Sequence, residues 1–159
     1  MLARLHVLRP HTKLLTNTQQ EGTIVVPGSP SPQKRHRSSF RSGKIRNYAP
    51  SAKDKKKFKV IAGALAPRSA LKGDISLNVT FYMPRPKTHR RTGKYSKLLK
   101  KDAPLWHSIK PDIDNLVKFV MDALQGILWE DDCKIVSLEA RKLYSEKPRT
   151  EIEFWTINE

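Results

Sequence analysis

The segment 74–84 constrains the fold of this chain more than any other, because its side chains alternate in polarity. Apolar side chains occupy the odd positions from Ile75 to Met83, and more polar ones lie between them. Successive side chains of a strand point to opposite faces. The segment therefore predicts a β-strand with one face in a hydrophobic core, and a second layer must cover that face.

Two helices are also expected. The first is predicted from Ser51, as its N-cap, to the residues before Pro67, which ends it. The second is predicted to begin at Asn115 with Asp114 as its N-cap. Both have apolar side chains at helical spacing, three or four residues apart. These are Phe58, Ile61, Ala62 and Leu65 in the first helix and Val117, Val120, Met121, Leu124 and Leu128 in the second.

Further strands are predicted at 22–26, 133–144 and 150–157, where β-branched and apolar residues recur. The resulting fold class is α+β (mixed α/β), a single compact domain with a small mixed sheet and two main helices. The domain is expected over 22–159, with basic loops at 27–48 and 85–108. Residues 1–21 are expected to be a disordered extension, and an organellar presequence is the alternative.

The charge of the chain is large and unevenly distributed. It has 31 Lys and Arg against 15 Asp and Glu, a net charge of +16, yet only 3 of the acids lie in residues 1–100. Such a field recruits polyanions and makes their binding salt-dependent. A merely soluble basic protein is the plainer alternative, and an anionic membrane surface fits less well because no basic helix has a broad apolar face.

The cysteine, histidine and apolar content of the chain argues against several kinds of site and segment. The single Cys133 cannot form an intramolecular disulfide, which favours a reducing, cytoplasmic compartment. The five histidines show no paired ligand spacing, so a zinc site is not expected. No apolar run approaches the length of a membrane span, and nothing indicates a small-molecule substrate.

The acids of the second half gather in one segment. Asp112 and Asp114 lie two residues apart before the second helix, and Asp131 and Asp132 follow it. A helix of about 14 residues is about 20 Å long, so the two pairs can meet only if the chain folds back. Convergent carboxylates would suit Mg²⁺, which prefers oxygen ligands and can lower the pKa of a bound water beside a phosphodiester.

Each acid also has a structural interpretation. Asp114 and Asp112 could serve only the helix start, Asp131 and Asp132 could form a solvated turn, and Lys118 with Asp122 could be an i,i+4 ion pair. The spacing alone does not decide between these interpretations and a metal site.

The segments "KPDIDNLVK", "MDALQGILWEDD" and "CKIVSLEARK", in this order, resemble the signature of the RusA family of Holliday-junction resolvases. The likeness extends more loosely to "VPGSPSPQKRHR" and "LNVTFYMPRP" and covers roughly residues 22–157. The resemblance implies a small α/β homodimer that binds branched DNA, four-way junctions above all. It would cut them with Mg²⁺, or Mn²⁺, by paired symmetric nicks in recombination and repair, in a bacterial or phage context.

Carried over by position, the resemblance implies that Asp112, Asp114 and Asp132 are the catalytic, metal-binding carboxylates, with Asp131 as a further metal ligand. Lys118 matches a functionally important lysine of the family. Dimerisation is implied too, and Val25, Leu138, Phe154 and Trp155 are interface candidates.

The DNA backbone is expected to contact a set of basic residues in the two basic loops. The set is Lys34, Arg35, Arg37, Arg41, Lys44, Arg85, Lys87, Arg90 and Arg91. Tyr95 and Trp106 could stack on exposed bases or pack in the core. The alternative functions are a non-catalytic basic nucleic-acid-binding protein and a metal-dependent RNase.

Overall fold

The alternating segment forms the central part of a four-stranded mixed sheet in the computed structural model, which describes residues 20–35, 37–41, 43–48 and 50–157. The strand order is β1 (Glu21–Pro27), β6 (Arg149–Ile157), β4 (Asp74–Pro84), β5 (Ile135–Ser145). β6 is antiparallel to β1 and β4, whereas β5 is parallel to β4. A mixed sheet with two main helices confirms the expected α+β class.

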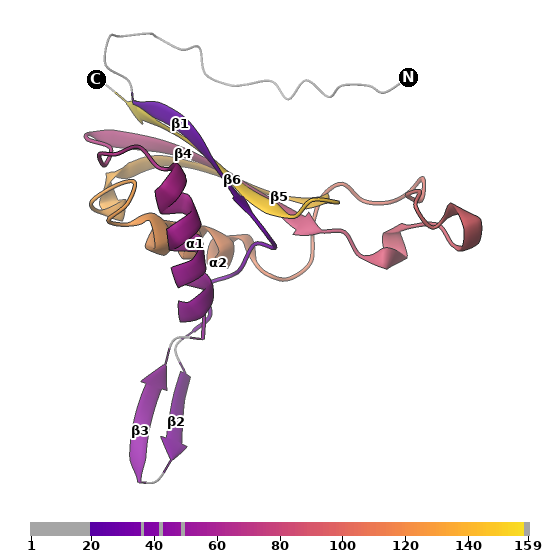
Figure 1. The fold of residues 1–159 in the computed structure, drawn as a ribbon, viewed down its shortest axis with the longest axis horizontal. Helices are drawn as coiled ribbons and strands as arrows, with labels where there is room; N and C mark the ends of the chain where they lie inside the picture. Colours follow the sequence, from indigo (N-terminus) through magenta and orange to yellow (C-terminus); the bar gives the residue numbers. More distant parts are fainter. Residues whose placement is uncertain (1–19, 36, 42, 49, 158–159) are drawn as a thin grey trace.

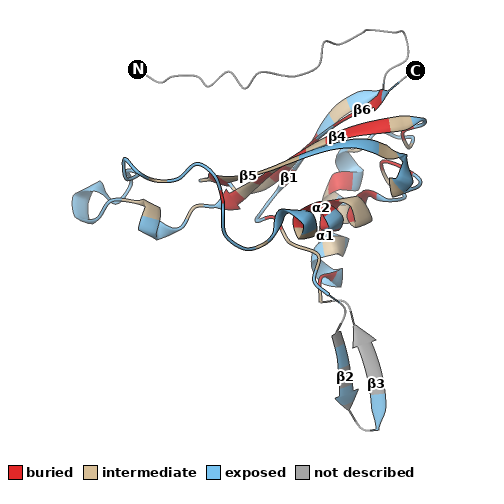
Figure 2. Ribbon diagram, turned by 180° about the vertical axis from the view of Figure 1, so that it is seen from behind, coloured by how far each residue is buried: buried red, intermediate tan, exposed pale blue. Residues whose placement is uncertain are grey.

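Helices α1 (Ala52–Leu65) and α2 (Ile113–Leu124) lie on the same face of this sheet (Figure 1). The odd positions of β4 are buried, as the alternation predicts, and pack with Ile24, Phe58 and Ile152 in one core cluster. Figure 2 shows the buried residues concentrated where the helices meet the sheet. The other face of the sheet carries mainly polar side chains of intermediate exposure.

The helix boundaries differ from the sequence expectation at both ends of α2. The helix begins at Ile113, and Asp112 is its N-cap, because the Asp112 carbonyl already accepts from the Leu116 N–H at 3.3 Å. It ends at Leu124, before Gly126 turns the chain at φ +78°. Leu128 is buried as expected, but it belongs to the turn that follows. In α1, Leu65 is 53% exposed and does not join the core.

The basic segment 27–48 is a loop only in its first half. Strands β2 (Arg37–Arg41) and β3 (Lys44–Tyr48) form an antiparallel hairpin, where an irregular arm was expected. The three prolines of the segment all precede residue 33, so nothing prevents a ladder after it. Gly43, at φ +73°, lies in the turn between the strands.

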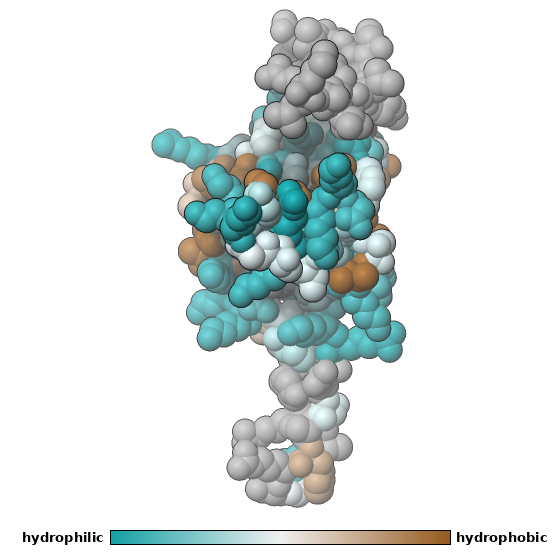
Figure 3. All heavy atoms as spheres, turned by 90° about the vertical axis from the view of Figure 1, so that its right-hand side faces the viewer, coloured by the Kyte–Doolittle hydropathy of each residue, from teal (hydrophilic) through white to brown (hydrophobic). Residues whose placement is uncertain are grey.

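The second basic loop, 85–108, projects from another side of the molecule, to the right in Figure 1, whereas the hairpin points downward. It contains two short 3₁₀ turns, Lys87–His89 and Gly93–Tyr95, and is otherwise irregular, as expected. Seen end-on, its surface is mainly hydrophilic with apolar side chains between (Figure 3). Across the described ranges, no helix is long and apolar enough to cross a membrane.

The expected extension is shorter than residues 1–21. The N–H of Gln20 donates to Thr156 Oγ1 at 3.0 Å, its carbonyl accepts from the Thr156 N–H, and Glu21 begins β1. These two residues therefore belong to the sheet. Residues 1–19 lie outside the described residues, so the extension or presequence stays a prediction.

Candidate active site

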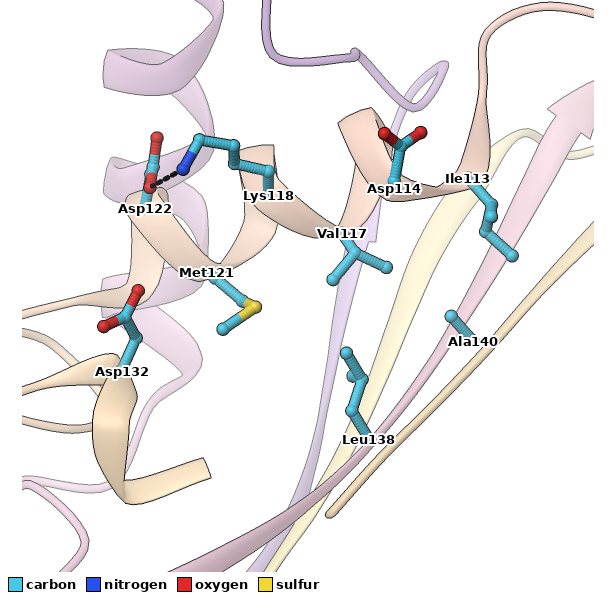
Figure 4. Close-up of a pocket in the computed structure, with 9 residues that line it drawn as sticks. All are labelled: Ile113, Asp114, Val117, Lys118, Met121, Asp122, Asp132, Leu138 and Ala140. Atoms are coloured by element: carbon cyan, nitrogen blue, oxygen red, sulfur yellow. Dashed lines mark ion pairs between the residues drawn. The ribbon is translucent and has the colours of Figure 1, made fainter. Parts of the chain in front are cut away.

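A cleft of about 450 Å³ lies between α2 and the neighbouring strand β5 (Figure 4). Its floor is apolar, and four charged side chains stand around it. It is lined by Ile113, Asp114, Val117, Lys118, Met121, Asp122, Asp132, Leu138 and Ala140. Two acids from opposite ends of the acidic segment, Asp114 and Asp132, thus share one cleft with Lys118.

The sheet topology explains why they can meet. Because β4 and β5 are parallel, the chain must cross back between them, and α2 is part of that crossover. The turn after α2 then brings Asp132, in the short 3₁₀ turn Asp132–Lys134, back beside the helix. The chain therefore folds back after α2, which is the condition for the two acidic pairs to approach each other.

Within the cleft, the carboxylates are spread along the helix. Asp114 lies in the first turn of α2, whereas Asp122 and Asp132 lie toward its other end (Figure 4). Eight residues separate Asp114 from Asp122, which corresponds to about 12 Å along the axis. Among the described residues, no three His, Cys, Asp or Glu side chains form a group that could hold a metal ion.

Asp112 does not line the cleft. It is exposed at the N-cap position, but its side chain makes no capping hydrogen bond. The structure therefore brings Asp114 and Asp132 into one cleft and leaves Asp112 just outside it. The joint role of the three carboxylates stays a prediction.

Asp131 and Asp132 have different environments. Asp131 Oδ1 accepts a hydrogen bond from the Cys133 N–H at 3.1 Å and so caps the 3₁₀ turn. This backbone N–H holds the pKa of the Asp131 carboxyl below its usual range, and a hydrogen bond with Asp132 contributes in the same direction. Asp132 lines the cleft instead. The geometry favours Asp132 over Asp131 for a role in the cleft.

Lys118 and Asp122 form the expected i,i+4 pair, with Nζ 4.0 Å from Oδ1. Asp122 Oδ2 also accepts a hydrogen bond from Lys55 Nζ of α1 at 2.9 Å. The tighter partner of Asp122 is thus Lys55, which links the two helices. The Lys118 side chain is 67% exposed, and its ammonium group is turned toward Asp122 (Figure 4).

Sequence reasoning missed the residue that holds the chain before α2 in place. Lys142 Nζ, from β5, donates to the carbonyl oxygens of Ile109 and Pro111 at 2.9 and 2.6 Å. The peptide bond between Lys110 and Pro111 is cis. Lys142 thereby ties the segment leading to Asp112 and Asp114 to the strand that follows Asp132. Only the place of Lys142 in the predicted strand that follows Asp132 could have suggested this contact.

The first basic loop is anchored at the same helix end. The Gln33 N–H donates to the Asn115 carbonyl at 2.8 Å, and the Lys34 N–H donates to Ser51 Oγ at 3.3 Å. Ser51 is the N-cap residue of α1 by position, but its hydroxyl bonds to this loop and not to its own helix. Lys34 and Arg35 are therefore exposed basic residues beside the start of α2.

The other expected DNA contacts fall into three groups. Lys44, Lys87 and Arg91 are exposed, and the Arg91 guanidinium lies over the ring of Tyr95, 4.6 Å from its centroid. Arg37 and Arg41 lie on β2, but their side chains are outside the described part of the structure.

Arg85 and Arg90 form the third group, because both are engaged within the protein. The Arg85 side chain is 7% exposed and donates to the carbonyl oxygens of Pro104 and Tyr144. Arg90 pairs with Glu146 and donates to the Lys97 carbonyl. Both side chains thus help to fix the 85–108 loop. Because the Arg85 side chain is buried, it is poorly placed to contact DNA directly.

Neither aromatic residue of that loop packs in the core. Tyr95 is 43% exposed and Trp106 is 59% exposed. Trp106 forms an isolated bridge with Leu143 of β5, so its backbone is fixed while its indole remains accessible. The core-packing alternative for these two residues is therefore wrong.

The donor set of the cleft suits a hard divalent cation in type, since Asp114 and Asp132 offer only oxygen ligands, Asp114 being exposed and Asp132 half-buried. Its spacing suits such an ion less well, because the acids are distributed along α2. The residues fit Mg²⁺ in chemistry, with Asp114 and Asp132 as the side chains that would hold it.

Comparison with known proteins identifies the family of this chain. The family model described as "Endodeoxyribonuclease RusA" matches residues 27–154. The uncharacterized protein YqaN of Bacillus subtilis (strain 168) is 37% identical over 131 residues, which cover 81% of this chain and 92% of that protein.

A second relative matches a shorter part of the chain. The protein named crossover junction endodeoxyribonuclease rusA, of Lactococcus phage r1t, is 42% identical over 53 residues, covering 33% of this chain and 40% of the phage protein. With a family model that spans most of the domain, the chain belongs to the RusA family of endodeoxyribonucleases.

Proposed function

We propose that this protein is a Mg²⁺-dependent endonuclease that resolves four-way DNA junctions by paired symmetric nicks during recombination and repair. The observation that carries the proposal is the cleft lined by Asp114, Lys118 and Asp132, with the exposed Lys34 and Arg35 near the start of α2. Membership of an endodeoxyribonuclease family, and a phage relative named for crossover junctions, support the class of substrate.

In the proposed reaction, Asp114 and Asp132 would hold Mg²⁺, with Asp112 two residues before Asp114. When bound, the ion would lower the pKa of a water molecule and offset negative charge at the phosphate under attack. The Lys118 ammonium, 67% exposed, is free to pair with a phosphate oxygen, because Asp122 has Lys55 as its closer partner. The apolar floor of Val117, Met121 and Leu138 limits the water that competes for these groups.

The basic residues hold the DNA that the carboxylates would otherwise repel. Lys34 and Arg35 approach from the first loop, and Lys87 and Arg91 from the second. Hydrogen bonds fix both loops where they join the rest of the domain. The positive charges of the two loops therefore lie on two sides of the domain that contains the cleft. Phosphate contacts of this kind position a duplex and carry little sequence information.

Paired nicks require two sites, so the proposal includes a homodimer. Val25 is 42% exposed and remains available for an interface, whereas Leu138, although 44% exposed, lines the cleft. Phe154 is 3% exposed and packs in the core, which removes it from the interface candidates.

The test is cleavage of a synthetic four-way junction by Asp114→Asn and Asp132→Asn. We expect wild-type protein to nick opposite strands with Mg²⁺ or Mn²⁺ and not with EDTA, and both variants to lose at least 100-fold in rate while still binding the junction. Glu153→Gln is the matched control, because Glu153 is an exposed acid on β6 that does not line the cleft.

Two outcomes would contradict the proposal. If Asp132→Asn nicks at a rate near that of wild type, this cleft is not the active site. Equal cleavage of structured RNA in competition would move the substrate from DNA to RNA. Asp112→Asn, run in parallel, separates a metal ligand from an N-cap: a loss of rate like that of Asp132→Asn supports the former.

A further inference from the structure

The β2–β3 hairpin, residues 37–48, is separate from the main sheet. In the described part of the chain, its two strands pair only with each other. It projects away from the helices and the four-stranded sheet, beyond the N-terminal end of α1 (Figures 1 and 2). A lone two-stranded hairpin is at best marginally stable in water. Contacts with a partner would therefore stabilise this hairpin.

The chemistry of the hairpin indicates what that partner is. The sequence RSSFRSGKIRNY contains four basic residues and no acid. Near its tip, Phe40 is 77% exposed, the largest exposure among the large apolar side chains that the structure describes. A cationic ribbon that carries the exposed ring of Phe40 matches a ligand with phosphates and exposed base faces. Four basic side chains would gain nothing from binding to a hydrophobic protein surface, whereas they can pair with phosphates.

The base of the hairpin lies next to the proposed active site. Its incoming strand follows Gln33 and Lys34, whose N–H groups bond to Asn115 and Ser51 at 2.8 and 3.3 Å. Asn115 directly follows Asp114 of the cleft. Five strand residues at about 3.4 Å each extend the hairpin by about 17 Å, close to the width of a duplex. DNA in the cleft would thus place its branch point within reach of the tip.

We propose that the hairpin binds the branch point of a DNA junction, with Phe40 stacked on a base exposed there and the basic residues on the flanking phosphates. This inference rests on the proposed function and adds the residue that distinguishes a junction from a duplex. In a continuous duplex the base faces are stacked and only their edges are accessible. At a branch point stacking is interrupted, so an aromatic face has a partner only in junction DNA.

The experiment compares Phe40→Ala with wild type for binding to a four-way junction and to a linear duplex of the same sequence, in EDTA so that nothing is cut. We expect junction affinity to fall about five- to 150-fold, the loss of one base–aromatic stack, and duplex affinity to stay within twofold. Phe40→Trp should restore the preference for the junction. A 2-aminopurine at the branch point should brighten with wild type and not with Phe40→Ala.

Two further variants separate stacking from other effects. Val60→Ala removes another exposed apolar side chain, 67% exposed on α1, and should change neither affinity. Lys44→Gln should weaken junction and duplex binding equally and reduce the salt dependence of both, as a phosphate contact does. Because Phe40 is so exposed, Phe40→Ala should leave the free energy of unfolding unchanged.

The inference is overturned if Phe40→Ala keeps the junction preference of wild type, or loses duplex binding to the same degree. It is also overturned if the variant loses only self-association in sedimentation, which would assign the hairpin to a second copy of the chain. These results are distinct from a failure of the proposed function. A wild-type protein that prefers junctions through Phe40 but never nicks them would refute the nuclease and leave the hairpin's role intact.

Discussion

Replacing Lys142 by Met tests whether the strand β5 positions the start of α2. The change keeps the length of the side chain but removes the donor to the carbonyl oxygens of Ile109 and Pro111. A hydrogen bond from a charged donor contributes about 1.5–3 kcal/mol when buried. Lys142 is only half-buried, so we take about 1–3 kcal/mol for the pair, because solvent weakens both bonds.

The effect should appear in catalysis more than in binding. If this free energy holds the segment 109–114 in its active position, Lys142→Met lowers the single-turnover nicking rate at saturating enzyme by about 5- to 150-fold. DNA affinity should change by less than about threefold, since one distant charge is lost. Amide hydrogen exchange at Asp114 and Asn115 should accelerate, because the helix start is released.

The control is Lys147→Met, which removes one exposed positive charge whose ammonium makes no hydrogen bond within the described residues. Lys142→Arg should recover part of the rate, since it keeps a charged donor. If Lys142→Met nicks as fast as Lys147→Met, with unchanged exchange at Asp114, then Lys142 does not position the site and the reasoning is wrong.

Three further predictions concern the acids, the core and pH. Asp131→Asn should retain most of the nicking rate that Asp132→Asn loses, because Asp131 serves mainly as the cap of a turn; single-turnover rates check this. Trp129→Ala should lower the free energy of unfolding in urea by about 3–5 kcal/mol, because Trp129 is fully buried. Trp129→Phe should cost much less, since no partner is described for the indole N–H. Burial, and then the Lys142 charge, lower the pKa of His107, so stability should fall as pH drops below about 6.5, where the unfolded chain binds the proton first. His107→Gln should show a smaller loss between pH 7.5 and 5 in urea titrations.

The sequence predicted the elements whose side chains follow one local period. The alternation in 74–84 and the apolar stripe of the second helix depend only on neighbours a few residues apart, so strand, helix and buried face could be assigned without a structure. Ile152 and Phe154 were placed on one face of the last strand for the same reason, and both are buried. The hairpin at 37–48 escaped prediction because its sequence shows no clear alternation of apolar and polar residues.

For the site, the sequence by itself determined which residue types are present and in what order: acids around one apolar helix in a basic chain, with a motif typical of the family. Only the tertiary structure decided which of them face one another. The parallel pairing of β4 and β5 returns the chain along α2, which places Asp132 in the cleft of Asp114 and lets Lys142 reach Pro111. It also buries the Arg85 side chain beside Tyr144. These contacts join residues 18 to 59 positions apart, and no local periodicity specifies them, because they depend on how strands and helix pack around a shared core.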